Sequence, residues 1–488
     1  MSEMSLAKEA PESGESGLHK GEEFGAEDVE IYSQENVREN NRIGDSIDRI
    51  SELPDCLLIH IISFLGVKKA AATSILGKRW QFLWSELWSL EFKYYDWGKG
   101  KSKETKNTID FVAWVNRIIA TRRGNYLEKM MVDFKYEDCF APDVDSWFEF
   151  ALKNKAKEIT FRLGDSKDFY ILRELMYSNS FLTSLSLKGC ILGPERSIKW
   201  SSLTKLQISG VNLPQSVVEK ILSGCPVLIS LDLSECWGFA VLEINSQYLC
   251  ELRVMDPENE ESGGFLQISA PYIKYFKLRF NAVGRQIKFK DISSLISADI
   301  DLSEPIWDLI IPEDVLSNTK EICEKIHHVK ELALGSEPLK ALAALVLNGW
   351  QLPNYKLRCL KIDMACHAFA GQTIPCIFEV LESSPDIETL VLQSYFPDDL
   401  DHDWDEPTKD SLVCDLLHLK TIRMCRMADP EHAGEPMLSL ARILLKSTPV
   451  LEEMEICLHI KDINVFVNIG QTLLSYPRSS PEAVIDLY

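Results

Sequence analysis

One spacing of apolar residues recurs along the chain and constrains its fold more than any other feature. Leu182, Leu185 and Leu187 follow the pattern Leu-x-x-Leu-x-Leu, and nine further segments repeat it with Leu, Ile, Val, Phe or Met. The end of the pattern has the two-residue period of a β-strand with one buried face. The ten clear copies begin at Leu182, Leu203, Leu228, Leu249, Ile273, Val329, Leu357, Ile387, Leu419 and Leu451.

The distances between these copies predict a solenoid. Copies that directly adjoin start 21 to 25 residues apart from Leu182 to Ile273, and 28 to 32 residues apart from Val329 to Leu451. These periods are typical of leucine-rich repeats, in which a short strand is followed by a return segment. One strand and one helix cannot bury their own apolar faces, whereas stacked repeats form a continuous core. We therefore expect an α/β fold with a curved parallel sheet and return helices, to which weaker copies at Ala156 and Ser297 also contribute.

Apolar residues at helical spacing between the strands predict where the return helices lie. Residues 216–223 carry four such side chains and end just before Gly224. The same pattern predicts return helices at 374–382 and 437–446, each followed by a Ser-Pro or Thr-Pro pair that stops the helix. A longer amphipathic helix is expected at 108–123.

A second feature is the density of apolar residues between positions 48 and 84. A helix predicted at 53–65 carries seven large apolar side chains between 57 and 65, too many to share one face. Two more short helices are expected at 68–74 and 77–84. A unit of about 40 residues rarely closes its own core. The excess apolar surface therefore predicts a covering partner, either the rest of this chain or another polypeptide.

The order of residues in this stretch resembles the F-box family. Gly66-Val67 stands where the family usually has Pro-Thr and Gly77 where it has Ser, both at helix junctions. The matching segments are Asp48-Arg49-Ile50, Leu53-Pro54-Asp55, Leu57-Leu58, Ser63-Phe64-Leu65, Ala72-Thr73-Ser74, Lys78-Arg79-Trp80 and Leu83-Trp84. The resemblance implies docking on a Skp-type adaptor and, through it, on a cullin scaffold and a ubiquitin-conjugating enzyme. The adaptor contacts are predicted at Leu53, Pro54, Leu57, Leu58, Ile61, Leu65 and Trp80.

The last part of the chain is similar to the FBD module of plant F-box/leucine-rich-repeat proteins. The similarity runs from Trp404 to Pro481 and includes Pro407, the run 416–422, and 476–481. In terms of its residues, this segment is two further strand–helix units that cap the solenoid. The expected domains are a disordered acidic tail at 1–46, an F-box at 47–90, a solenoid at 91–403 and an FBD module at 404–481.

Charge and cysteine usage narrow the class of protein. The formal net charge of −22 argues against nonspecific binding to nucleic acid or to anionic membranes, because both require a basic face. The 13 cysteines contain no C-x-x-C pair, which favours reduced thiols in the cytoplasm or nucleus over a disulfide framework. No run of 18 apolar residues occurs, so we expect a soluble intracellular protein.

Candidate binding residues follow from the strand pattern. The leucines of each repeat face the core, so the residues between them face the opposite surface. The middle exposed positions are Ser186, Gln207, Asp232, Arg253, Lys277, Asp301, Lys361, Arg423 and Glu455. We predict target contacts at Lys188, Lys205, Arg253, Tyr275, Lys277 and Arg279. The alternative is that Asp232 with Arg253, and Lys277 with Asp301, are lateral charge pairs worth under about 1 kcal/mol each.

Several motifs that suggest other chemistry fail on their spacing. The acidic run 398–406 lacks the Gly and Glu of a calcium loop, and Cys359, Cys366 and His367 fit no common zinc finger. Tyr95 stands where the first glycine of a phosphate-binding loop ending at 100–102 would be required. No H-E-x-x-H, G-x-S-x-G or G-x-G-x-x-G motif is present. We therefore expect no cofactor, no metal and no catalysis by this chain.

The expected function is substrate recognition in a Skp–cullin–F-box ubiquitin ligase, with the solenoid holding a target protein. Two alternatives stay open. One is a binding scaffold that holds the adaptor without recruiting a cullin. The other is a receptor in which a small molecule on the concave surface joins the target to it.

Overall fold

The computed structural model describes residues 50, 52–96, 104–164, 167–257, 264–281, 284–302, 311–365, 373–395, 416–427, 434–458 and 463–488. The predicted acidic tail, the acidic run 398–406, the 100–102 segment, Trp404, Pro407, Cys366 and His367 lie outside these ranges. The chain divides into two compact units, Met1–Leu58 and Ile59–Tyr488. The described end of the first unit contains the start of helix α2 (Asp55–Ser63), where the Leu57 amide donates to the Pro54 carbonyl at 3.0 Å.

The second unit begins with the short helical elements that the sequence predicts. α2 ends at Ser63, and Gly66, at a φ of +71°, starts α3 (Gly66–Ala72). The end of the expected second helix is a 3₁₀ segment, η1 (Thr73–Leu76), and a second one, η2 (Trp80–Glu86), stands where the third helix was expected. Ile62, Val67 and Ala70 are buried.

Fifteen strands in the described part of the chain form one sheet, and every neighbouring pair is parallel. Each of the ten clear sequence copies supplies one strand, which confirms the predicted parallel sheet. The strands, in spatial order, are β1 (Ser89–Lys93), β2 (Lys129–Asp133), β3 (Glu158–Arg162), β6 (Ser184–Lys188), β9 (Lys205–Ser209), β10 (Ser230–Ser234), β12 (Glu251–Met255), β14 (Tyr275–Phe280), β16 (Ser297–Leu302), β17 (Glu331–Leu334), β18 (Cys359–Ala365), β19 (Thr389–Tyr395), β20 (Thr421–Met427), β21 (Glu453–Leu458) and β22 (Val484–Leu487).

The register of the sheet stacks the repeated apolar residues into buried rows. Leu185 lies beside Leu206, and the row continues through Leu231 to Leu252. These side chains are at most 2% exposed. The core of the unit is therefore a set of continuous apolar rows running along the solenoid.

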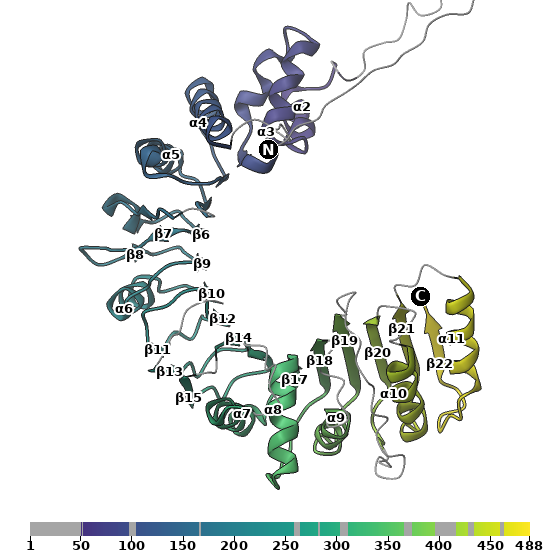
Figure 1. The fold of residues 1–488 in the computed structure, drawn as a ribbon. Coiled ribbons are helices and arrows are strands. Elements are labelled where there is room, and N and C mark those ends of the chain that lie inside the picture. The colour runs from purple at the N-terminus through teal and green to yellow at the C-terminus, as the bar shows by residue number, and fades with distance from the viewer. Residues whose placement is uncertain are drawn as a thin grey trace, which may run out of the picture. The chain divides into compact units, whose positions relative to one another are not determined.

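The return helices lie on one side of the strands (Figure 1). We call the opposite side of the strands the open face. Helix α9 matches its predicted range most closely and α6 extends one residue beyond its range at each end, while α4 starts four residues before its prediction. The helices are α4 (Glu104–Thr121), α5 (Ala141–Lys153), α6 (Gln215–Gly224), α7 (Glu313–Ile326), α8 (Ser336–Leu347), α9 (Thr373–Glu382), α10 (Gly434–Ser447) and α11 (Ile463–Ser475).

The middle of the solenoid uses strands in place of return helices. β11 (Val241–Glu243), β13 (Gly264–Ser269) and β15 (Arg285–Asp291) form a separate three-stranded parallel sheet. Two smaller pairs, β4 (Tyr170–Ile171) with β7 (Cys190–Ile191) and β5 (Ser178–Asn179) with β8 (Lys199–Trp200), serve earlier repeats. A strand advances about 3.3 Å per residue and a helix about 1.5 Å, so a short repeat closes more easily with a strand.

Candidate functional site

The register of the open face differs from the sequence-based expectation at one strand. Lys277 lies beside Asp299, whereas Asp301 lies two residues further along and beside Arg279. The assignment of Asp301 to the middle row was therefore wrong. The reason is Ala298, a small residue that occupies a core position opposite Phe276 and is 1% exposed.

Three of the predicted target contacts have a carboxylate on the neighbouring strand. Arg253 lies 3.5 Å from Asp232, Lys277 lies 2.5 Å from Asp299, and Arg279 lies 3.1 Å from Asp301. Burial raises the pKa of Asp301 and outweighs the opposing effect of Arg279. Exposed pairs of this kind contribute about 0–1 kcal/mol each. These cations are thus partly neutralised, as the lateral-pair alternative expects.

Lys188 and Lys205 differ from those three residues. Within the described ranges, neither side chain forms an ion pair. Lys188 lies directly beside Arg162 of β3, whose own carboxylate partner, Asp133, is 3.8 Å away. Like charges side by side on adjacent strands repel each other. This part of the open face therefore presents positive charge that its own carboxylates do not neutralise.

A pocket of about 610 Å³, which we call the open-face pocket, is lined by Lys188 and Arg162 but not by Lys205. Arg162, Lys188 and Lys135 line it together with the side chains of Ser186 and Gln207, which hydrogen-bond to each other at 2.9 Å. Asp133 and Glu235 also line the pocket, so three cations face two carboxylates there, and its chemistry suits a hydroxyl-rich group that can bind to both. Sequence reasoning missed Arg162 and Lys135, although Arg162 directly follows Phe161 in the weak copy at Ala156. Tyr275, the sixth predicted contact, is half exposed but lies outside this pocket.

The predicted adaptor contacts divide by exposure. Leu57, Ile61 and Leu65 are 43–47% exposed, and Pro54 is also exposed. Leu53 is half buried. Leu58 and Trp80 are 0% and 7% exposed, so their side chains are part of the interior.

More large apolar side chains are exposed in the helical part of the second unit. Phe64 is 76% exposed and Ile75 is 88% exposed, and Leu76 and Phe82 are exposed as well. Monomeric soluble proteins rarely leave several such residues uncovered, and those that do usually bind a partner there.

Comparisons with known proteins decide the family. Residues 118–456 match the domain described as At1g61320/AtMIF1, LRR domain. The F-box/LRR-repeat protein At3g03360 of Arabidopsis thaliana is 30% identical over 369 residues, which cover 71% of this chain and 70% of that protein. The chain belongs to the plant F-box/leucine-rich-repeat family. Another similar protein is the F-box/LRR-repeat protein At5g02910 of A. thaliana, 27% identical over 439 residues, or 85% of this chain and 90% of that protein. The similarity to an FBD module stays a prediction.

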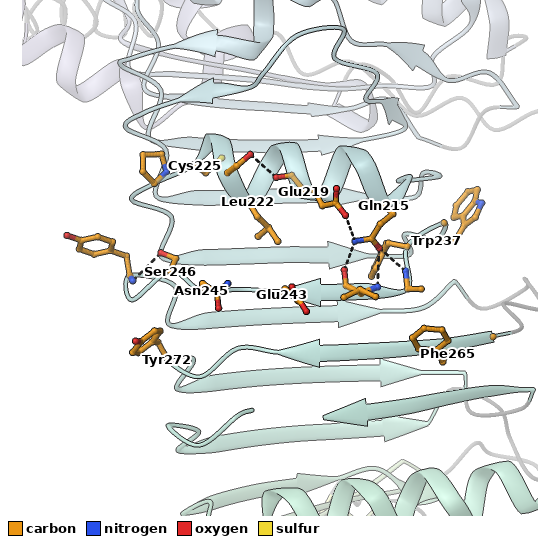
Figure 2. A pocket seen from close by; sticks show the side chains of 18 of the residues that line it. Gln215, Glu219, Leu222, Cys225, Trp237, Glu243, Asn245, Ser246, Phe265 and Tyr272 are labelled. Carbon is orange, nitrogen blue, oxygen red and sulfur yellow. Dashed lines mark hydrogen bonds between the residues drawn. The ribbon is translucent and has the colours of Figure 1, made fainter. Parts of the chain in front are cut away.

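The F-box/leucine-rich-repeat chain has a second, larger cavity of about 1360 Å³ on the helix side of the main sheet. We call it the helix-side cavity. It lies between α6 and β11, and Figure 2 shows Gln215 and Glu219 of α6 on one side and Glu243 and Asn245 on the other. Trp237 and Phe265 lie at one end of it and Tyr272 at the other (Figure 2).

A buried ion pair supports the wall of this cavity. The Arg285 guanidinium lies 2.6 Å from Asp256, and both side chains are at most 5% exposed. Burial raises the pKa of Asp256, although Arg285 and the Asn281 amide, which donates to the carboxylate at 3.1 Å, act to lower it. Because Arg285 is matched by this carboxylate, it adds no net charge to the cavity.

The described residues offer neither a metal site nor a membrane-spanning helix. Across the described ranges, no group of three or more His, Cys, Asp or Glu side chains is placed to hold a metal ion. Cys359, one of the three candidate zinc ligands, lies half buried in β18. Among the helices that the structure describes, none is long and apolar enough to cross a membrane.

Proposed function

We propose that this protein is the substrate-recognition subunit of a Skp–cullin–F-box ubiquitin ligase. The observation that carries the proposal is an F-box-like sequence whose large apolar side chains are exposed in the chain on its own. The similar A. thaliana proteins are named F-box/LRR-repeat proteins, which supports it. The chain itself supplies binding, and the ubiquitin chemistry takes place on other subunits.

The adaptor contact rests on the exposed members of the predicted set. Leu57, Ile61 and Leu65 recur every four residues in the sequence, and each is more than two-fifths exposed. Such aliphatic anchors usually carry most of the energy of an interface. Leu58 and Trp80 support the contact from the interior, since neither side chain is accessible to a partner.

The open face captures the target. A protein bound there is tethered to the same assembly as the conjugating enzyme, which raises the effective concentration of its lysines near the active thioester. Lys188 and Lys205, with Arg253, Tyr275, Lys277 and Arg279 on the neighbouring strands, are the proposed target contacts.

Replacing Leu57 and Ile61 together by Ser tests the adaptor contact. Both are exposed, so the double variant should stay folded but should lose co-purification with the Skp-type adaptor. Ile463→Ser, at a 77% exposed position of α11, is the matched control and should bind the adaptor as the wild type does. Undiminished adaptor binding by the folded double variant would contradict the proposal. Recovery of adaptor without cullin would instead identify a binding scaffold.

The open-face pocket favours a second candidate, a receptor that needs a small molecule to bind its target. Its volume of about 610 Å³ lies within the range of about 300–1,000 Å³ usual for small-ligand sites. Native mass spectrometry of the purified adaptor complex distinguishes the two. A bound small molecule, lost on Lys188→Glu substitution, favours the receptor, and an unliganded complex that still captures targets excludes it.

A further inference from the structure

The three-stranded sheet β11–β13–β15 has two edges, and the structure treats them differently. On the β15 edge, α7 closes the outward-facing peptide groups. The Asn318 side chain accepts a hydrogen bond from the Ile287 amide at 2.9 Å and donates one to the Arg285 carbonyl at 2.7 Å. Glu321 accepts another from the Phe289 amide at 3.3 Å. Side chains of one helix thus form three hydrogen bonds to this edge, between Arg285 and Phe289.

On the β11 edge, one side chain satisfies only the first outward-facing residue. The Gln215 amide donates to the Val241 carbonyl at 3.0 Å, and its oxygen accepts from the Val241 amide at 3.1 Å (Figure 2). In this arrangement Gln215 takes the place of a peptide group on a neighbouring strand. The Gln215 side chain thus shows that the β11 edge can accept and donate strand-like hydrogen bonds on the side that faces α6.

The next outward-facing residue is Glu243. The Gln267 amide donates to the Ala240 carbonyl, and the Ile244 amide donates to the Ser269 carbonyl, both at 2.8 Å. In a parallel ladder these bonds direct Leu242 and Ile244 towards β13 and leave the peptide of Glu243 directed to the other edge. Among the hydrogen bonds of the described residues, none satisfies the Glu243 peptide on that side. Glu243 lines the helix-side cavity.

The walls of the cavity indicate what kind of segment fits beside β11. Tyr248, Phe265 and Tyr272 line it and are about half exposed, which offers apolar contact area. Its charged lining residues are Glu219, Glu243 and Arg285. Arg285 is matched by Asp256, and Glu243 forms an exposed pair with Lys290 of β15 at 3.5 Å, which leaves Glu219 as the excess negative charge. At about 1360 Å³ the cavity exceeds the usual size of a small-ligand site.

We infer that the β11 edge and the helix-side cavity form a docking groove for an extended segment of a partner protein. The segment adds as a strand beside β11, hydrogen-bonds to the Glu243 peptide and carries a Lys or Arg side chain among apolar ones. Main-chain bonds supply affinity and alternate side chains supply specificity, as in other cases of strand addition. The groove is independent of the open face and of the adaptor contact.

A library of random linear peptides, displayed on phage and panned on the full-length protein, tests this inference. We expect enriched peptides in which a basic residue is flanked by apolar residues at alternate positions. A labelled copy of one such peptide should bind in solution and should slow hydrogen exchange at the Glu243 amide.

Two variants locate the binding. Glu243→Lys reverses an exposed charge and should weaken the labelled peptide by about tenfold or more, because it places like charges together. Glu251→Lys, at an exposed position of β12 on the open face, is the matched control and should leave affinity unchanged. Methylating the peptide nitrogens that face β11 should abolish binding, whereas methylating the alternate ones should not.

Other outcomes overturn the inference. Panning that enriches no peptide, or peptides that bind Glu243→Lys as tightly as the wild type, would exclude the groove. Equal binding by all the methylated peptides would exclude strand addition. Concentration-dependent self-association that Glu243→Lys abolishes would show that the occupant is a second copy of this chain.

Discussion

Gly189 occupies a backbone position that a side chain cannot share. Its φ is +71°, and an added Cβ would lie 2.2 Å from the carbonyl oxygen of Leu163. We expect Gly189→Ala to lower the free energy of unfolding by about 1–3 kcal/mol, the usual cost of such a conformation. Urea unfolding followed by circular dichroism measures this. Gly193→Ala, where nothing lies within 4 Å of the added Cβ, should be nearly neutral, and equal effects of the two would contradict the argument.

Asp145 gives stability that depends on pH. Burial acts to raise the pKa of its carboxyl, but hydrogen bonds from Arg173 and Tyr170 act the other way and the net pKa is lowered. A carboxyl with a lowered folded pKa stabilises above its unfolded pKa of about 3.9, and the effect is lost as the pH falls through the folded value. Asp145→Asn should therefore be less stable than the wild type near neutral pH, and the difference should shrink below about pH 4.

Urea unfolding of both proteins across this range of pH is the measurement. Glu149→Gln changes an exposed carboxylate on the same helix and should follow the wild type at every pH. A difference between Asp145→Asn and the wild type that is the same at acid and neutral pH would contradict the assignment.

Individual residues were the hardest to predict from the sequence. The excess of apolar side chains between 57 and 65 was visible, but which of them point inwards was not. Leu58 is buried while Leu57 is 47% exposed, and only packing against other elements decides this. Asp301 was assigned to the wrong row for a similar reason. The side chain of Ala298 is too small for the sequence pattern to identify it as a core position.

At the scale of elements, repeat length separates the two kinds of return segment. Copies 21 or 24 residues apart, such as those from Leu228 to Ile273, enclose β11 and β13, whereas the 25-residue step from Leu203 to Leu228 encloses α6. The steps of 28, 30 and 32 residues that begin at Val329, Leu357 and Leu419 also enclose helices. The spacing thus contained information that predicts where the helix layer gives way to strands, and hence where the helix-side cavity forms.

The buried Asp256–Arg285 pair anchors β15, the last strand of the small sheet. Arg285→Met leaves the Asp256 carboxylate buried without its partner, so we expect a loss of about 3–5 kcal/mol in the free energy of unfolding. Replacing both residues, in Asp256→Leu/Arg285→Met, removes the unpaired charge and should recover much of that loss.

Urea unfolding compares the two variants. Lys290→Met, which removes an exposed pair with Glu243 at 3.5 Å, is the control and should change stability by less than about 1 kcal/mol. A double variant that is less stable than Arg285→Met alone would show that the pair matters for its hydrogen bonds, such as that from Asn281, and not for charge balance.

At the scale of the whole molecule, the repeated pattern predicted the parallel sheet because burial in a solenoid depends on neighbouring repeats alone. Two strands were missed although the signal was present. Leu87, Leu90 and Phe92 carry the pattern at β1, and Leu127, Met130 and Val132 carry it at β2. Their starts lie 40 residues apart, longer than the period found elsewhere, because α4 and its connections intervene. β22 lacks the first apolar residue of the pattern.

Lateral pairing changes which part of the open face is expected to hold a target. Arg253, Lys277 and Arg279 have carboxylates within 3.5 Å on adjacent strands, so a ligand must compete with those partners. Lys188 forms no ion pair with any described residue, and Arg162 has only a partner at 3.8 Å. An acidic or phosphorylated segment of a target would gain more from these two cations than from the three paired ones.

Charge reversal therefore distinguishes target binding at Arg162 and Lys188 from target binding at the paired cations Arg253, Lys277 and Arg279. We expect Arg162→Glu/Lys188→Glu to weaken target capture by about tenfold or more, because it turns the unneutralised charge against an acidic ligand. The triple reversal of Arg253, Lys277 and Arg279 should weaken capture less. Quantitative proximity labelling with and without proteasome inhibition measures capture, with Lys290→Glu, on the small sheet, as the control. If the set of labelled proteins is unchanged by the double variant but lost in the triple variant, the target binds at the paired cations instead. If neither variant changes that set, the open face is not the surface that captures the target.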